Sequence, residues 1–265
     1  MATEISSPLN AALAKLRAEI DNGRGLLNTL RVHGDHYLLE FALMSYLRGA
    51  IASAEVIELA ANARHPEGTE PVTRSLFETS LDLLYLLTGP TADEDAARTL
   101  VSDLQEWERQ LTLHEKASSP DLPAMPPRTE ADETFKAFAT QLDGVGCDTT
   151  ALRRLYAEAK GKGRPPHWSG RTRTDIIAEL ERRGSDAAPM LRAMWANMSG
   201  EAHASVGWVT LAAAVQRDGT LHVPDTAMSD DAEVARVADA GASLLFIVRR
   251  CVTRYHEAPY TPAQV

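Results

Sequence analysis

Apolar residues recur every three or four positions along most of the chain, which is the spacing of one face of an α-helix. In the first such stretch they are Leu9, Leu13, Leu16 and Ile20. Ser7 and Pro8 precede this stretch as a helix cap and first helical residue, and Asn22-Gly23 follows it as a stop signal. The pattern therefore predicts an N-terminal helix over residues 8–22.

Start and stop signals divide the rest of the chain into further helices. Asp35 precedes a long amphipathic run over 36–64, which ends before Pro66 because the residue before a proline disfavours the helical conformation. Thr91 and Glu94 form the sequence pattern of a capping box. The same reading predicts helices over 70–88, 91–117, 130–142, 149–159, 175–183 and 230–256, and one that begins at Asp186 and carries Ser199 and His203.

These elements predict an all-α fold, a bundle of about eight helices. The stretch 209–223 leaves two interpretations open, because Arg217-Asp218-Gly219 suits a small β-hairpin whereas Ala212-Ala213-Ala214 suits continued helix. We expect one helical domain over residues 1–265, built from an N-terminal helix 8–22, a core bundle 36–117 and 130–205, and a C-terminal helix 230–256.

Composition narrows the function classes. The net charge of −10 excludes a basic footprint over the whole surface, so any anion must bind at a local patch. The two cysteines, Cys147 and Cys251, form no CxxC pair and no zinc-ligand spacing, so we expect free thiols, no metal and no other cofactor, and a cytoplasmic location. No secretory signal begins the chain, and the apolar run 240–248 is far shorter than the roughly 20 residues that span a bilayer. We therefore expect neither a membrane nor a lipid partner.

Two apolar helices carry polar side chains that predict an internal cluster. One contains Asn197, Ser199 and His203, the last two sharing a helix face. The other contains Arg74, Glu78 and Asp82, spaced four apart. Because an unpaired buried polar group costs about 1–3 kcal/mol, we expect the two sets to be partners.

A basic loop lies just before the helix that carries His203. Residues 160–174 contain five Lys or Arg residues and no Asp or Glu, in a chain that is acidic overall. The candidate ligand-binding residues of this loop are Lys162, Arg164, His167, Trp168, Arg171 and Arg173. Trp168 offers a ring on which a base stacks, and three glycines allow the backbone to approach a ligand. A solvated surface loop of no function explains the same charges.

Three motifs carry a resemblance to a known group of proteins. They are Arg74-Ser-Leu-Phe-Glu78-x-x-x-Asp82-Leu-Leu-Tyr, Trp168-Ser-Gly-Arg and Met198-Ser199-Gly-x-x-His203. Over residues 38–205 the chain resembles an uncharacterised bacterial family of unknown function, all-helical, which looks like a relative of the HEPN bundles. HEPN proteins include metal-independent ribonucleases of toxin–antitoxin and phage-defence systems, often with the site at a homodimer face.

The resemblance implies RNA or a nucleotide as the partner. His203 would be the general acid or base, Arg74 the phosphate clamp, and Asn197 and Ser199 their polar supports, with Glu78 and Asp82 beside the substrate. The chain departs from the HEPN signature, since the nearest upstream arginine, Arg192, precedes His203 by eleven positions.

Two alternatives remain open. In a non-enzymatic binding or scaffold module, His203 would hydrogen-bond to Glu78 or Asp82 and fix the register of two helices. In a metal-binding bundle, His36 and Glu40 would join these residues as ligands. No Walker sequence, GxGxxG or GxSxG motif is present, which argues against P-loop, Rossmann and α/β-hydrolase chemistry.

Overall fold

The computed structural model describes residues 7–31, 36–65, 69–89, 91–117, 130–160, 162, 167–202 and 231–257. These residues form nine helices and no strand, which confirms the all-α bundle. The helices are α1 (Pro8–Thr29), α2 (Tyr37–Asn62), α3 (Glu70–Thr88), α4 (Ala92–Ala117), α5 (Glu130–Gly144), α6 (Thr150–Ala159), α7 (Arg173–Arg182), α8 (Ala188–Ala202) and α10 (Asp231–Glu257). The stretch 209–223, for which a hairpin was one interpretation, lies outside the described residues.

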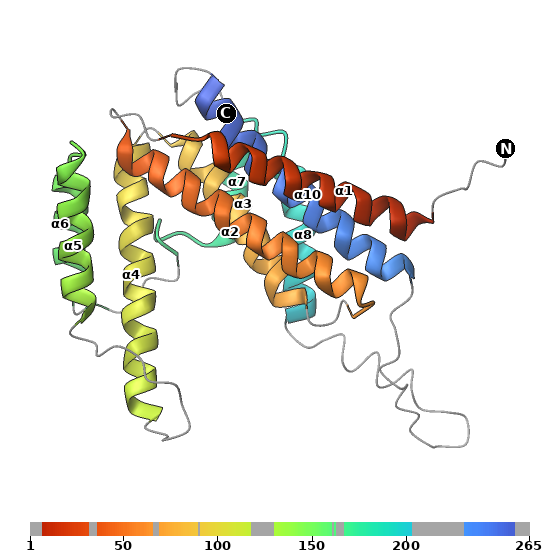
Figure 1. Ribbon diagram of the computed structural model, residues 1–265, viewed down its shortest axis with the longest axis horizontal. Helices are drawn as coiled ribbons and strands as arrows, with labels where there is room; N and C mark the ends of the chain where they lie inside the picture. Colours follow the sequence, from red (N-terminus) through yellow and green to blue (C-terminus); the bar gives the residue numbers. More distant parts are fainter. Residues whose placement is uncertain are drawn as a thin grey trace.

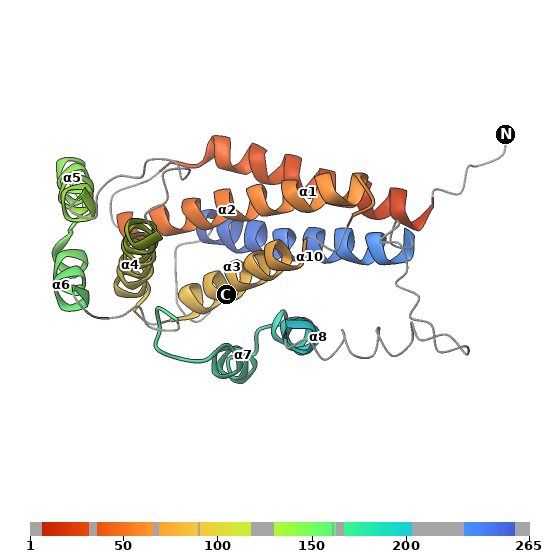
Figure 2. The ribbon, with the colours of Figure 1, turned by 90° about the horizontal axis from the view of Figure 1, so that it is seen from below.

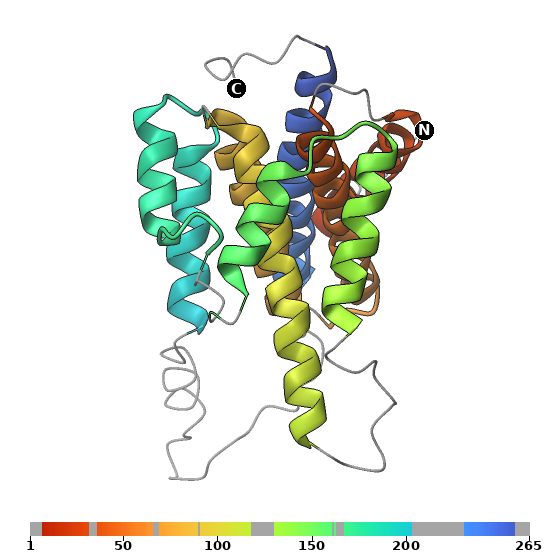
Figure 3. The same ribbon diagram turned by 90° about the vertical axis from the view of Figure 1, so that its left-hand side faces the viewer.

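The helices pack in layers. Seen from below, α1 and the α7–α8 pair lie on opposite sides of the molecule, with α2, α10 and α3 between them (Figure 2). The α5–α6 pair lies at one end of the molecule and packs against α4 (Figure 1). The view from that end shows α7 and α8 side by side next to α3 (Figure 3). The outer pair α7–α8 thus meets the rest of the bundle through α3.

Leucine and isoleucine side chains from the central helices fill the core. Leu16 of α1, Leu43 of α2 and Leu244 of α10 are completely buried, as is Phe77 of α3. Burying one such side chain stabilises the fold by about 1.5–3 kcal/mol, so the contacts of these helices dominate the stability. Ser80 of α3 is a fully buried polar residue in this layer, and its hydroxyl lies 2.9 Å from the carbonyl of Leu76 and 3.3 Å from that of Leu244.

The N-terminal helix is longer than predicted. It was expected to stop at Asn22-Gly23, but α1 continues through both residues to Thr29. Gly23 is buried, and a Cβ atom there would lie 3.1 Å from Cγ1 of Ile51. The glycine permits a close approach of α1 to α2 and does not end the helix, and this packing outweighs its weak helix propensity.

Other helix ends lie within a few residues of the predictions. α3 and α4 end at Thr88 and Ala117, as expected. The capping box predicted at Thr91 is replaced by a different contact, because its hydroxyl donates to Asp95 at 3.1 Å while Glu94 accepts from Arg98 and Arg154. None of the described helices combines the length and the apolar character needed to cross a membrane.

A capping box does form at the start of α7. The Thr172 hydroxyl accepts from the backbone N–H of Asp175, and the Asp175 carboxylate accepts from the backbone N–H and the hydroxyl of Thr172. This exchange starts the helix at Arg173, two residues before the predicted start. It also fixes the point at which the preceding loop enters the helix.

Candidate anion-binding site

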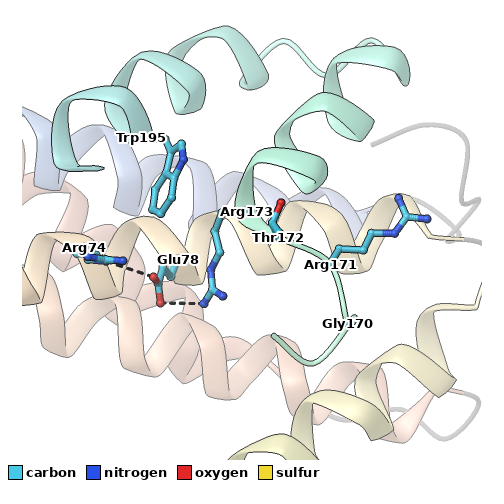
Figure 4. Close-up of a pocket in the computed structure, with 7 residues that line it drawn as sticks. All are labelled: Arg74, Glu78, Gly170, Arg171, Thr172, Arg173 and Trp195. Atoms are coloured by element: carbon cyan, nitrogen blue, oxygen red, sulfur yellow. Dashed lines mark hydrogen bonds and ion pairs between the residues drawn. The ribbon is translucent and has the colours of Figure 1, made fainter. Parts of the chain in front are cut away.

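A cavity opens between α3, α8 and the loop that leads into α7 (Figure 4). Its volume is about 410 Å³. It is lined by Arg74, Glu78, Gly170, Arg171, Thr172, Arg173 and Trp195. Three of these seven residues are arginines and only one is acidic, so we call it the arginine cavity.

Glu78 links two of the arginines. Nε of Arg74 donates to one carboxylate oxygen at 3.4 Å, and Nη2 of Arg173 donates to the other at 3.2 Å (Figure 4). The Arg74–Glu78 contact is the four-residue pair expected along α3, whereas Arg173 reaches Glu78 from α7. The side chains of Arg74 and Glu78 are 40% and 30% exposed, so this cluster lies at the surface of the cavity and not in the sealed core that the apolar neighbours suggested.

Trp195 forms the wall opposite Glu78. Its indole stacks on Phe77, with ring centroids 5.9 Å apart and planes inclined by 14°. The guanidinium carbon of Arg74 lies 5.6 Å from the centre of the same indole, a cation–π contact. Trp195 therefore both packs on the core and lines the cavity.

Arg171 lines the cavity but its guanidinium turns away from Glu78 (Figure 4). It lies 5.9 Å from the centre of the Tyr85 ring and 3.5 Å from the Glu179 carboxylate. Hydrogen bonding to Arg183, together with the nearby charges of Arg182 and Arg171, holds the pKa of Glu179 below its usual value. Arg171 therefore closes the loop onto α3 and α7, and Arg74 and Arg173 are the cations that the cavity presents.

We call the loop 167–172 the strap. Its first residue, a buried histidine, anchors it to α3. The His167 side chain is 1% exposed, and its Nε2 lies 2.7 Å from a carboxylate oxygen of Asp82. Its Nδ1 lies 2.6 Å from the hydroxyl and 3.1 Å from the backbone nitrogen of Ser169. Two residues predicted to bind substrate, His167 and Asp82, are thus joined underneath the strap.

Trp168 is 9% exposed and packs at 5.7 Å from Tyr85 and 5.0 Å from the His167 ring, measured between ring centroids. It lines a second cavity of about 460 Å³ on the other side of the strap, which also contains Lys162. Because Trp168 is almost completely buried, it forms part of the cavity wall and does not present an exposed ring face for stacking. Gly170, in the left-handed conformation with φ of +71°, lines both cavities.

The predicted catalytic helix is described only in part. Asn197 and Ser199 belong to α8 but their side chains lie outside the described residues, as do His203 and Arg164 entirely. The described half of the helix places Trp195 at the cavity next to Arg74. α8 therefore meets α3 at Trp195, whereas the predicted pairing of Asn197, Ser199 and His203 with the Arg74 set lies outside the described side chains.

The residues named for a metal centre belong to separate contacts. Nδ1 of His36 lies 2.6 Å from Asp93, Glu78 pairs with arginines, and Asp82 pairs with His167. Across the described ranges, no three His, Cys, Asp or Glu residues gather in a group that could hold a metal ion. The structure does not bring Glu40, Glu78 and Asp82 together as ligands.

Comparison with known proteins places the central part of this fold in a family. The sequence model of the family of unknown function named DUF5677 matches residues 40–217, more than half of the chain. The chain belongs to this family. The match includes α3, the strap, α7 and α8, so both walls of the arginine cavity are DUF5677 structure. Neither the curated proteins nor the solved structures contain a match to the chain.

Sequence reasoning missed two contributors to the cavity, Thr172 and Trp195, and only the first had a signal in the sequence. Thr172 and Asp175 have the spacing of a capping box, which would have placed the start of α7 and the end of the strap. Trp195 follows Arg74 in no sequence pattern, because the two residues come from helices far apart in the chain and meet only through the packing of α8 on α3.

Proposed function

We propose that this DUF5677 protein binds the phosphate of a nucleotide or of RNA in the arginine cavity. The observation that carries the proposal is that Arg74 and Arg173, from two different helices, flank a single carboxylate at the wall of a cavity that also holds an indole. Guanidinium groups bind phosphate through two parallel hydrogen bonds, and an aromatic wall suits a base.

Glu78 does not prevent this binding. Ion pairs at exposed or half-exposed positions are worth about 0–1 kcal/mol, so an incoming phosphate can replace Glu78 on either arginine at small cost. Arg74 and Arg173 both contact this one carboxylate, so a phosphate that replaces Glu78 would meet two guanidiniums. In the free protein Glu78 holds both cations in place, and a phosphate carries more acceptor oxygens for the same donors.

The reaction that we propose for the bound ligand is metal-independent cleavage of RNA, in bacterial defence or a toxin–antitoxin pair. His203 would be the acid or base, supported by Asn197 and Ser199, in the continuation of the α8 segment beyond Trp195. The resemblance to HEPN proteins supports this part, together with the homodimer that we propose. Two buried free cysteines, Cys147 and Cys251, support a reducing cytoplasm as the location.

Binding can be tested with three glutamine variants. Removing one charged hydrogen-bond partner of a phosphate costs about 1.5–3 kcal/mol, so Arg74→Gln and Arg173→Gln should each weaken binding roughly 10- to 100-fold. The measurement is fluorescence anisotropy with a labelled single-stranded RNA and calorimetry with AMP. Arg192→Gln is the matched control, because Arg192 pairs with Glu181 on the neighbouring helix α7 and does not line the cavity. Equal affinity of all three variants would contradict the proposal.

Glu78→Gln separates this proposal from the scaffold alternative. If the cluster binds phosphate, loss of the carboxylate that competes for Arg74 and Arg173 should tighten anion binding several-fold. If the cluster only joins α3 to α7, the variant should lower the melting temperature and leave the affinity for AMP and RNA at its wild-type level.

The cleavage step has its own test. His203→Ala should abolish cleavage of labelled RNA in the presence of EDTA while circular dichroism shows an unchanged fold. A folded His203→Ala variant that still cleaves RNA would rule out the assigned role of this histidine, without affecting the phosphate-binding proposal.

A further inference from the structure

We propose that Ser169 is a nucleophile, activated by His167 and Asp82, for acyl transfer in the second cavity. The cavity lies between α4, α6 and the strap, and its wall residues include Arg98, Ser102, Leu155, Lys162, Trp168 and Ser169. This inference goes beyond the phosphate site, because it concerns a different cavity, different residues and a different reaction.

The hydrogen bonds of His167 define its tautomer. The backbone N–H of Ser169 donates to Nδ1 at 3.1 Å, so Nδ1 carries a lone pair. Nε2 must then carry the hydrogen, which it donates to the Asp82 carboxylate at 2.7 Å. The imidazole is oriented by an acid on one side and presents a base on the other, which is the arrangement that activates a serine.

The Ser169 hydroxyl points its hydrogen at that base. Its oxygen lies 2.6 Å from Nδ1, and it also accepts the backbone N–H of Arg171 at 3.3 Å. Because Nδ1 is an acceptor in this tautomer, the hydroxyl is the donor in the contact between Oγ and Nδ1. The second lone pair of the oxygen is available for attack, and Ser169 is half-buried at the wall of the cavity.

The position of the histidine favours this chemistry over simple packing. The ring is almost completely buried, while the serine attached to it reaches a cavity of about 460 Å³, room for a small ligand. The buried indole Nε1 of Trp168, the residue between them, has no hydrogen-bond partner among the described residues. An unpaired donor beside an activated hydroxyl is a feature of ligand sites more than of a filled core.

The lining indicates the class of substrate. Lys162 supplies a cation, and Val101, Leu155 and Ala159 supply an apolar side. The other two charged residues of the lining are paired, Arg98 with Glu94 and Asp95, and Glu158 with Arg154. This set fits a short acyl ester that carries an anionic group at its other end.

The proposed reaction has two steps. In the first step the Ser169 hydroxyl gives its proton to Nδ1 and its oxygen bonds to the carbonyl carbon. The C–O bond to the alcohol breaks, and the alcohol leaves with the proton from Nδ1. Water then repeats the sequence, releasing the carboxylic acid and restoring the serine.

A fluorophosphonate probe tests the nucleophile directly, since it forms an Oγ–P bond and releases fluoride. Treatment of the full chain, followed by peptide mass spectrometry, should place one adduct on Ser169. General-base assistance is worth about 100-fold or more, so Asp82→Asn and His167→Gln should slow labelling at least to that extent. Ser45→Ala, which removes an exposed hydroxyl on α2 that lines neither cavity, should label like the wild type. No adduct, or an adduct on a different serine, would overturn the proposal.

Two further variants keep the test decisive if Asp82→Asn or His167→Gln fails to fold. Ser169→Cys preserves the contacts of the strap and should react with iodoacetamide much faster than the buried Cys147 and Cys251. Lys162→Gln should lower the rate with a p-nitrophenyl ester that carries a terminal carboxylate and leave p-nitrophenyl butyrate unaffected. Ordinary thiol reactivity, or no hydrolysis of either ester by the wild type, would contradict a nucleophilic role.

Discussion

Glu78 and Asp82 lie one helical turn apart on α3 and yet take part in different chemistry. Glu78 accepts hydrogen bonds from Arg74 and Arg173 at the arginine cavity. Asp82 accepts from a buried histidine beneath the strap. The spacing of four predicts a shared face, but the partner of each carboxylate is decided by which residue of the strap or of α7 lies over it. A carboxylate pair in the sequence is therefore two separate sites in the fold.

The capping box at Thr172 makes one contribution to stability dependent on pH. The Thr172 hydroxyl and backbone N–H lower the pKa of Asp175. Its unfolded pKa is about 3.9, so the stabilisation is fully present above that pH and is lost as the pH falls through the lower, folded pKa. Asp175→Asn should therefore reduce the urea midpoint at pH 7 and have a smaller effect near pH 2.5.

Thr172→Ala tests the same contact from its other side. Loss of a helix cap costs about 1 kcal/mol at pH 7. In the double variant the effect of Asp175→Asn should shrink, because the partner that lowers the pKa is gone. Strictly additive effects at pH 7, or an effect of Asp175→Asn that grows towards low pH, would show that the box does not operate as described.

At the residue scale the sequence identified which residues form the cluster, but it did not predict which of the candidates are buried. Arg74, Glu78 and Arg173 were all candidates, and they meet in one cluster. His167 was expected to bind substrate, but it is buried, because Asp82 of α3 lies within hydrogen-bond distance of its ring. Exposure of a loop residue depends on what lies beneath the loop, and no local spacing reports that.

The length of α1 is set by its neighbours. Two glycines in its second half have opposite surroundings: Gly23 faces Ile51 closely, whereas a Cβ atom at Gly25 would meet nothing within 4 Å. Glycine is a weak helix former in both places, but only at Gly23 does the missing side chain allow two helices to approach. Gly23, which has the sequence pattern of a helix stop, is thus the point at which α1 packs closely on α2.

This difference predicts opposite outcomes for two substitutions. Gly25→Ala should stabilise the protein by about 0.5–1 kcal/mol through helix propensity and raise the melting temperature by about 2 °C. Gly23→Leu should destabilise it by about 1–3 kcal/mol, because the side chain would be forced against Ile51. Calorimetry on both variants tests the prediction. If α1 ended near residue 22, both substitutions would lie outside a helix and both effects would be near zero.

Helices were predictable from the sequence because their periodicity and end signals are local. Thr88 and Ala117 end α3 and α4 as expected. Two signals failed because each has two structural solutions: Gly23 lies at a helix crossing, and Thr91 bonds to Asp95. The choice between the solutions is made by residues from other helices, which a single-sequence pattern does not contain.

The family match and the hydrophobic core have different boundaries. The match covers residues 40–217, but α1 and α10 lie outside it and pack on each other and on α2. Gly241 of α10 contributes to this packing, since a Cβ atom there would lie 3.3 Å from Ile57. Two ion pairs, Lys15–Asp239 and Arg249–Glu19, also join α1 to α10. α1 and α10 therefore complete the same hydrophobic core to which the helices of the matched region belong.

This arrangement predicts that a destabilising substitution in α1 lowers the stability of the whole bundle. Leu16→Ala removes a completely buried side chain and should lower the free energy of unfolding by about 3 kcal/mol. All four tryptophans lie within residues 40–217, so their fluorescence reports unfolding away from α1 and α10. Fluorescence and circular dichroism should show the same shift in midpoint. Leu59→Ala, at a side chain 72% exposed, is the control and should change stability by no more than about 0.5 kcal/mol.

Gly170 belongs to the walls of both cavities. A ligand that moves the strap from one side must change the space that is left on the other. If a ligand in one cavity moves the strap, the two sites are linked thermodynamically, and the factor by which it changes affinity in the other cavity applies equally in the reverse direction. A phosphate held by Arg74 and Arg173 would then act as an effector of the serine across the strap, and a substrate at the serine as an effector of phosphate binding.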